Sequence, residues 1–146
     1  MTDAELVAKK LAEIETRLRE LRTDADLDRL QRDVKEERFA AHTLQLAVQA
    51  ALDVASHVVA DERLGEPATN QELFSLLERH GWIGEELADR LRDMARFRNL
   101  LVHGYAKIDL GRLEQILRHH LGDLEAFVEA VRRKISEPPP SDPAPE

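Results

Sequence analysis

The sequence predicts an all-α fold, an antiparallel helical bundle of about five helices, and two observations lead to this prediction. Apolar residues recur every three or four positions along most of the 146 residues, which is the period of amphipathic helices. Alternating runs of β-branched residues and Asn-Gly hairpin turns, which indicate strands, do not occur in the sequence. The chain length fits a single domain with a sizeable hydrophobic core.

Two long helices are predicted first. One runs from about Asp3 to Arg22, with Thr2 or Asp3 as its N-cap and with apolar residues at helical spacing: Leu11, Ile14, Leu18 and Leu21. The other runs from about Asp28 to Asp61, through Phe39, Leu44, Val48, Ala51, Ala55 and Val58. The many alanines of this second helix allow a neighbouring helix to approach closely.

Three further helices follow the turn GEPATN. Gly65 ends the second helix, and Thr69 or Asn70 caps a short third helix, QELFSLLERH, which ends at Gly81. The fourth covers residues 85–103, EELADRLRDMARFRNLLVH, and turns inward Leu87, Leu91, Met94, and Phe97 or Leu101. Asp109 caps a fifth helix that continues through Leu113, Ile116, Leu117, Leu121, Leu124, Val128 and Val131.

Residues 1–136 are expected to form one helical domain, and residues 137–146 a separate tail. The tail, EPPPSDPAPE, holds five of the six prolines and is predicted to be disordered, because proline prevents helix formation. The amino-terminal TDAELVAKK is charged and lacks an apolar signal core, and no run approaches the roughly 18 apolar residues of a membrane span. These features predict a cytoplasmic protein without a membrane partner.

Composition excludes several kinds of site. The chain has no cysteine, which rules out disulfides, a thiolate nucleophile and a cysteine-based zinc site. No histidine pair has the His-Glu-x-x-His spacing, and the neighbours His119 and His120 point in different directions on a helix, so we expect neither a metal nor a cofactor. The net charge of −8, from 21 basic and 29 acidic residues, argues against a surface that binds nucleic acid everywhere.

A local basic segment nevertheless stands out within this acidic chain. Residues 89–98, DRLRDMARFR, place four arginines among two aspartates. The simplest interpretation is a solvated helix face with the ion pairs Asp89–Arg92 and Asp93–Arg96. The segment leads directly into RNLLVHGY, residues 98–105, in which an apolar stretch is enclosed by arginine, histidine and tyrosine.

The motif RNLLVHGY raises a geometric question. Arg98 and His103 are five residues apart, which separates them by about 140° around an α-helix. Joint use of the two side chains therefore needs a distorted helix end or a second chain. Gly104 fits a helix stop, and this would leave His103 in the last turn, where the helix dipole favours the imidazolium form.

The order of these elements resembles the HepT branch of the HEPN-domain ribonucleases. RNLLVHGY fits the Arg-x4-His-x-Tyr signature of that family, and the likeness extends over the predicted helices from about residue 4 to residue 135. One departure is Arg96, where family members usually carry a small residue. The resemblance implies a homodimer whose two motif helices meet to form one RNA cleft, which answers the geometric question.

The same resemblance implies an endoribonuclease toxin of a type VII toxin–antitoxin system. It would cleave RNA, expected to be tRNA, without a metal ion and leave a 2′,3′-cyclic phosphate. Arg98 would hold the phosphate and stabilise its developing charge, His103 would move protons, and Asn99, one turn earlier, would orient His103. The implied partner is a minimal nucleotidyltransferase antitoxin (MntA-like) that neutralises the toxin by transferring AMP to Tyr105.

Two alternatives remain open at the level of sequence. Gln49, Asp53 and His57 form a polar stripe on the second predicted helix, which either lines the cleft, with Asp53 in a supporting role, or marks an exposed edge. The alternative to catalysis is a HEPN helical adaptor that binds RNA or a nucleotide, or scaffolds the nucleotidyltransferase, without cutting RNA. Both functions predict a dimer with a basic cleft, and cyclic phosphate ends on RNA separate them.

Overall fold

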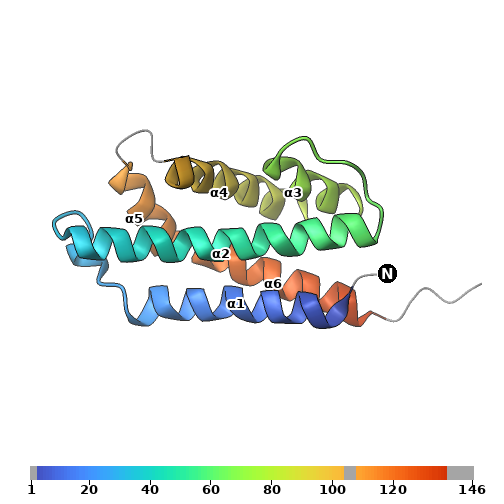
Figure 1. Ribbon diagram of the computed structural model, residues 1–146, viewed down its shortest axis with the longest axis horizontal. Coiled ribbons are helices and arrows are strands. Elements are labelled where there is room, and N and C mark those ends of the chain that lie inside the picture. Colours follow the sequence, from blue (N-terminus) through green and yellow to red (C-terminus); the bar gives the residue numbers. More distant parts are fainter. Residues whose placement is uncertain (1–2, 104–107, 138–146) are drawn as a thin grey trace, which may run out of the picture.

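All regular structure in the computed structural model, which describes residues 3–103 and 108–137, is helical (Figure 1). These ranges hold six α-helices and one short 3₁₀ helix: α1 (Ala4–Thr23), η1 (Leu27–Arg29), α2 (Val34–Asp61), α3 (Asn70–Arg79), α4 (Glu85–His103), α5 (Leu110–His119) and α6 (Leu121–Ser136). The predicted all-α fold is confirmed. The predicted tail beyond residue 137, and Gly104 and Tyr105 of the motif, lie outside the described residues.

The bundle is built around α2, which packs against α1, α3, α4 and α6 (Figure 1). α1 runs antiparallel to α2 along one side with α6 next to it, and α3 and α4 cover the other side. Six of the thirteen buried residues of α2 are alanines, which lets these neighbours approach closely, as predicted. Across the core, the rings of Phe74 and Phe127 meet edge to face with centroids 5.8 Å apart.

Side-chain caps fix where the helices begin. The Asp3 carboxylate accepts from the Leu6 N–H at 3.1 Å, so Asp3 caps α1. The Thr69 hydroxyl accepts from the Glu72 N–H at 3.3 Å and caps α3. Asp109 caps α5 as predicted. Short polar side chains at these positions satisfy N–H groups that the first helical turn leaves without partners.

The second helix begins later than predicted, at Val34 and not near Asp28. Residues 27–29 form the 3₁₀ helix η1, which Asp26 caps by accepting from the Asp28 N–H at 3.2 Å. Asp33 then caps α2 by accepting from the Lys35 N–H at 2.9 Å. These two aspartates compete with helix formation by bonding to the nearby backbone, which apolar spacing does not reveal.

The fifth predicted helix is divided into α5 and α6 at His120. The N–H of this residue makes the last hydrogen bond of α5, to the Ile116 carbonyl at 2.9 Å, but its own backbone leaves the helical region (φ −123°, ψ 2°). Leu117, Leu121 and Leu124 are all buried. Apolar spacing therefore passes through the bend unchanged, and for this reason the periodicity predicted one continuous helix.

Among the described residues, one helix, α2, has the length and composition that could cross a membrane. However, 61% of its most apolar window is buried inside the bundle. The core helix of a soluble protein meets the same criterion, so this feature is weak evidence for a membrane span.

Candidate active site

The two motif side chains lie on different sides of α4, as the helix geometry predicted. Arg98 is half-buried on the side that faces α2, whereas His103 is the last residue of the helix and is exposed. The described part of α4 extends to His103, which lies in its last turn, whereas Gly104, the predicted helix stop, lies outside the described residues. In a single chain, therefore, the arginine and the histidine do not face each other.

The guanidinium of Arg98 is held by two neutral oxygens. Its Nη2 donates to Gln49 Oε1 on α2, and its Nη1 donates to Asn99 Oδ1 at 3.1 Å. The Asn99 oxygen also accepts from Asn70 Nδ2 of α3 at 3.5 Å. Arg98 Nε is buried and has no hydrogen-bond partner among the described residues. These hydrogen bonds hold both terminal nitrogens of Arg98, and neither acceptor carries a negative charge that would neutralise the guanidinium.

A chain of polar contacts continues from Arg98 to α1. Gln49 Nε2 donates to Asp53 Oδ1 at 2.8 Å, one turn along α2. Asp53 Oδ2 in turn lies 3.3 Å from Lys10 Nζ of α1. We refer to Lys10, Asp53, Gln49 and Arg98 as the polar relay. Gln49 and Asp53 therefore connect to the motif and do not form an isolated exposed edge, whereas His57 takes no part in the relay.

The other arginines of the basic segment are paired with carboxylates. Arg90 contacts Glu86 at 2.9 Å, Arg92 contacts Glu78 at 3.1 Å, and Arg96 pairs with Asp93. Burial alone would lower the pKa of Arg92, but its hydrogen bonds to Glu78 and Asp89 raise that pKa above its usual value. The predicted pairs Asp89–Arg92 and Asp93–Arg96 are both present, but only Arg90 and Arg96 are well exposed, because the side chain of Arg92 is mostly buried against α3. Arg98 differs because its contacts are amide oxygens.

Asn99 is tied to the arginine of the motif. Its oxygen accepts from Arg98 and from Asn70, so it joins α4 to α3 at the point where Arg98 is held. The predicted hydrogen bond from Asn99 to His103 stays a prediction. Asn70 of α3 contacts Asn99, and Lys10 of α1 contacts Asp53. Nothing in the sequence indicated that either residue belongs to the site, because neither is part of the motif or of the polar stripe.

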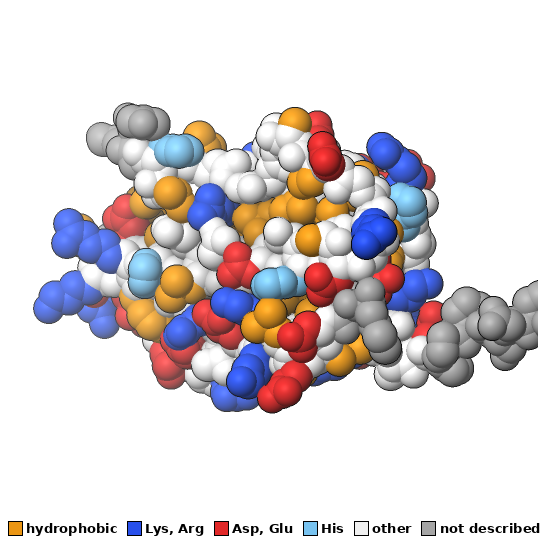
Figure 2. Space-filling model, turned by 45° about the vertical axis from the view of Figure 1, so that its right-hand side comes forward, with side chains coloured by type: hydrophobic (Ala, Val, Ile, Leu, Met, Phe, Trp, Pro, Cys, Tyr) orange, Lys and Arg blue, Asp and Glu red, His pale blue; other side chains and the backbone are white. Residues whose placement is uncertain are grey.

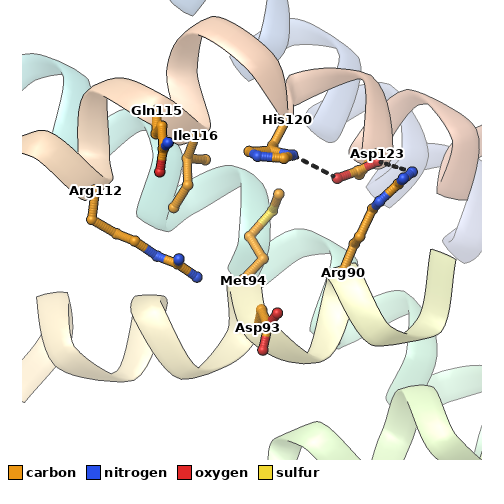
Figure 3. A pocket seen from close by; sticks show the side chains of 8 residues that line it. All are labelled: Arg90, Asp93, Met94, Arg112, Gln115, Ile116, His120 and Asp123. Carbon is orange, nitrogen blue, oxygen red and sulfur yellow. Dashed lines mark hydrogen bonds and ion pairs between the residues drawn. The ribbon is translucent and has the colours of Figure 1, made fainter. Parts of the chain in front are cut away.

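The face of the molecule seen in Figure 2 has no broad basic area among its described residues. Figure 2 shows acidic and basic side chains interspersed over one face of the molecule, in keeping with the negative net charge. A separate pocket lies between α4, α5 and α6 (Figure 3). In it, Asp123 lies 3.5 Å from both Arg90 Nη1 and His120 Nδ1. Arg98, Asn99, His103 and Asp53, the predicted site residues that the structure describes, do not line this pocket.

Metal ligands do not gather in the described part of the chain. It contains no group of three or more histidine or carboxylate side chains placed to hold one metal ion. The half-buried polar groups that do converge are the amide oxygens around Arg98, which are neutral hydrogen-bond acceptors.

Comparison with known families decides the classification. The family model described as Ribonuclease HepT-like matches residues 11–131, which span η1 and α2 to α5 in full and parts of α1 and α6. The chain belongs to the HepT-like ribonuclease family. The resemblance inferred from RNLLVHGY and the order of helices is therefore confirmed.

Two curated relatives are HepT nucleases. The chain is 33% identical over 89 residues to the mRNA nuclease HepT of Shewanella oneidensis, an alignment that covers 61% of this chain and 67% of that protein. It is 31% identical over 88 residues to the tRNA nuclease HepT of Aphanizomenon flos-aquae, which covers 60% of each chain. Their names give two different RNA classes as substrates.

Solved structures extend the likeness to the whole HepT-like fold. A tri-AMPylated HEPN toxin of Shewanella oneidensis, solved in complex with an MNT antitoxin, superposes with a TM-score of 0.83 at 27% identity, over 91% of this chain and 99% of that one. A toxin–antitoxin complex with AMP-PNP gives a TM-score of 0.83 at 25% identity, over 88% of this chain and 98% of that one. Both structures come from toxin–antitoxin systems.

Proposed function

We propose that this HepT-like chain is a cytoplasmic ribonuclease toxin that cleaves RNA with Arg98 and His103. The observation that carries the proposal is that Arg98, on the motif helix of a ribonuclease family, is held within the described residues by neutral oxygens, whereas three other arginines of α4 are paired with carboxylates. A fixed guanidinium without a carboxylate partner suits a phosphate group, which it binds through two parallel hydrogen bonds.

In the proposed reaction, the ribose 2′-oxygen forms a bond to the adjacent phosphorus while the bond from phosphorus to the 5′-oxygen breaks. A 2′,3′-cyclic phosphate remains on one fragment and a 5′-hydroxyl on the other. Arg98 stabilises the charge that develops on the phosphate oxygens. A proton leaves the 2′-hydroxyl and another reaches the departing 5′-oxygen, and His103 serves this transfer because imidazole gains and loses protons near neutral pH.

Asn99 and Asp53 keep supporting roles in this proposal. The Asn99 oxygen is engaged by Arg98 and Asn70, which leaves the amide nitrogen of Asn99 to orient His103 one turn later. Asp53 acts at a greater distance, through its hydrogen bond from Gln49. We propose that no metal ion takes part, so cleavage should persist in the presence of EDTA.

A homodimer would complete the site. Leu100 and Val102, next to His103 on α4, are 68% and 41% exposed. Burying a leucine side chain stabilises by about 1.5–3 kcal/mol, so this end of α4 favours contact with a second apolar surface. Within one chain, the separation of about 140° around α4 keeps His103 away from Arg98. A two-fold axis near α4 would instead bring His103 of the partner subunit towards Arg98.

The proposed partner is a nucleotidyltransferase antitoxin that transfers AMP to Tyr105. Two solved relatives come from toxin–antitoxin complexes, and in one of them the HEPN toxin is AMPylated. A phosphate added close to the motif would pair with the guanidinium of Arg98 and occupy the place of the RNA phosphate. Intact mass spectrometry after co-expression should find added AMP on the wild type and none on Tyr105→Phe, and equal mass gains would place the acceptor elsewhere.

The ribonuclease function is tested by the ends that it leaves. Purified protein should cut RNA in the presence of EDTA and produce fragments that end in 2′,3′-cyclic phosphate. Offering tRNA and mRNA separately distinguishes the two substrate classes named for the relatives, and tRNA is the predicted substrate. RNA that is bound but not cut by the wild type would show instead that the chain is a non-catalytic HEPN adaptor.

A further inference from the structure

We infer that Gln49 is the positioning residue of Arg98, and that it acts as a neutral spacer between the guanidinium and the carboxylate of Asp53. The inference rests on the proposed function, in which Arg98 binds the RNA phosphate. It is carried by the polar relay, in which each member contacts the next across three helices. Gln49 lies outside the sequence motif and comes from α2.

Asp53 determines which way the Gln49 amide faces. A glutamine amide has an oxygen that accepts and a nitrogen that donates, and its two orientations place these groups on opposite sides. Because the Asp53 carboxylate only accepts, the Gln49 nitrogen turns towards it at 2.8 Å, and the Gln49 oxygen is left to face Arg98. Lys10, 3.3 Å from Asp53 on the other side, holds the carboxylate in place.

The neutrality of Gln49 has a chemical purpose. If a carboxylate bound Arg98 directly, it would neutralise the charge that the RNA phosphate requires and would compete with it for the guanidinium. The relay avoids this because Asp53 is matched to Lys10, while Arg98 is given an uncharged oxygen. The arrangement fixes the arginine without reducing its attraction for an anion.

The hydrogen-bond inventory of Arg98 agrees with this assignment. A guanidinium has five N–H groups, of which one on Nη2 is bound by Gln49 and one on Nη1 by Asn99. Among the described residues, one N–H on each terminal nitrogen is therefore not used by these two contacts. The relay thus leaves both terminal nitrogens able to donate to the oxygens of a phosphate.

Two substitutions at Gln49 separate geometry from charge. Leucine at position 49 has a similar volume but no acceptor, so in Gln49→Leu the guanidinium of Arg98 should lose its orientation. The value of kcat should fall by about 10- to 100-fold, the same effect as removing a group that orients a metal ligand. Gln49→Glu keeps the acceptor and adds a negative charge, so it should hold Arg98 but raise KM for RNA. Gln45→Glu, one turn earlier on α2, adds the same charge outside the relay and serves as the control.

Asp53 provides a second test through the amide orientation. Asp53→Leu removes the acceptor that turns the Gln49 nitrogen away from Arg98, whereas Asp53→Asn retains an oxygen that can accept from it. The leucine variant should therefore lose more kcat than the asparagine variant. Equal losses in the two variants would contradict the proposed control of the Gln49 amide.

A measurement without RNA tests the positioning role of Gln49 independently of the proposed ribonuclease function. In ¹⁵N NMR spectra of the wild type and of Gln49→Glu, the two terminal nitrogens of Arg98 should give separate signals, because rotation of the guanidinium is restricted; in Gln49→Leu they should merge. Spectra that are the same for wild type and Gln49→Leu, or unchanged kcat and KM in folded Gln49→Leu, would overturn the positioning role. Absence of cleavage by the wild type would overturn the proposed function, and the NMR comparison would still decide whether Gln49 positions Arg98.

Discussion

Arg98→Ala is the substitution that best separates chemistry from stability in this protein. It removes the guanidinium but leaves the turn of α4 intact, because alanine is a strong helix former. The groups directly affected are Gln49 Oε1 and Asn99 Oδ1, which each lose a donor. Asn99 Oδ1 keeps its second donor, Asn70 Nδ2.

The effect on stability should be small. Each lost hydrogen bond costs about 1 kcal/mol, and less where water can replace the donor, as it can at these half-buried side chains. The substitution also removes the buried Arg98 Nε, which has no partner among the described residues and itself carries a desolvation cost of about 1–3 kcal/mol. The two effects oppose each other, so the free energy of unfolding should change by about 1 kcal/mol or less.

The effect on cleavage should be much larger. Loss of one group that stabilises developing negative charge reduces kcat by about 10²–10³-fold, which corresponds to about 2.7–4 kcal/mol. Thermal unfolding by circular dichroism and cleavage of labelled RNA measure the two quantities on the same preparation. The matched control is Arg96→Ala, an exposed arginine on the same helix that pairs with Asp93. A folded Arg98→Ala protein that cleaves as fast as this control would refute the role of Arg98.

Four further substitutions or deletions test other parts of the structure. His103→Ala should fold normally, since the side chain is exposed at a helix end, and should lose RNA cleavage; a folded variant that still cleaves has no need of His103 for proton transfer. Leu100→Glu should shift the protein from dimer to monomer in light scattering, and a wild type that is active as a monomer would contradict the dimeric site. Phe127→Ala should lower the free energy of unfolding in urea by about 3–5 kcal/mol because the ring is fully buried, so a loss below about 1 kcal/mol would contradict the packing against Phe74. Deleting residues 137–146 should leave the melting temperature nearly unchanged, and a large decrease would show that the tail docks on the domain.

The sequence by itself determined the fold class and most helix positions. Apolar spacing and capping residues such as Asp3, Thr69 and Asp109 are local features, since a helix forms its hydrogen bonds within one segment and its caps lie next to it. These local features did not predict every helix boundary correctly. Apolar spacing placed the start of the second helix too early, because the side chains of Asp26 and Asp33 bond to the nearby backbone there. It also missed the bend at His120, because buried apolar residues continue at helical spacing on both sides of that residue.

Only the tertiary structure decided which residues from other helices surround Arg98 of the motif. The spacing of Arg98 and His103 established their separation around α4, but no pattern in one segment could reveal that Arg98 meets Gln49, 49 residues earlier, or that Lys10 holds Asp53 from α1. Such contacts depend on which faces of α1, α2 and α4 come together when the core is buried. The charge available at Arg98 is likewise a property of its neighbours in space, because a guanidinium beside an amide oxygen and one beside a carboxylate look the same in sequence.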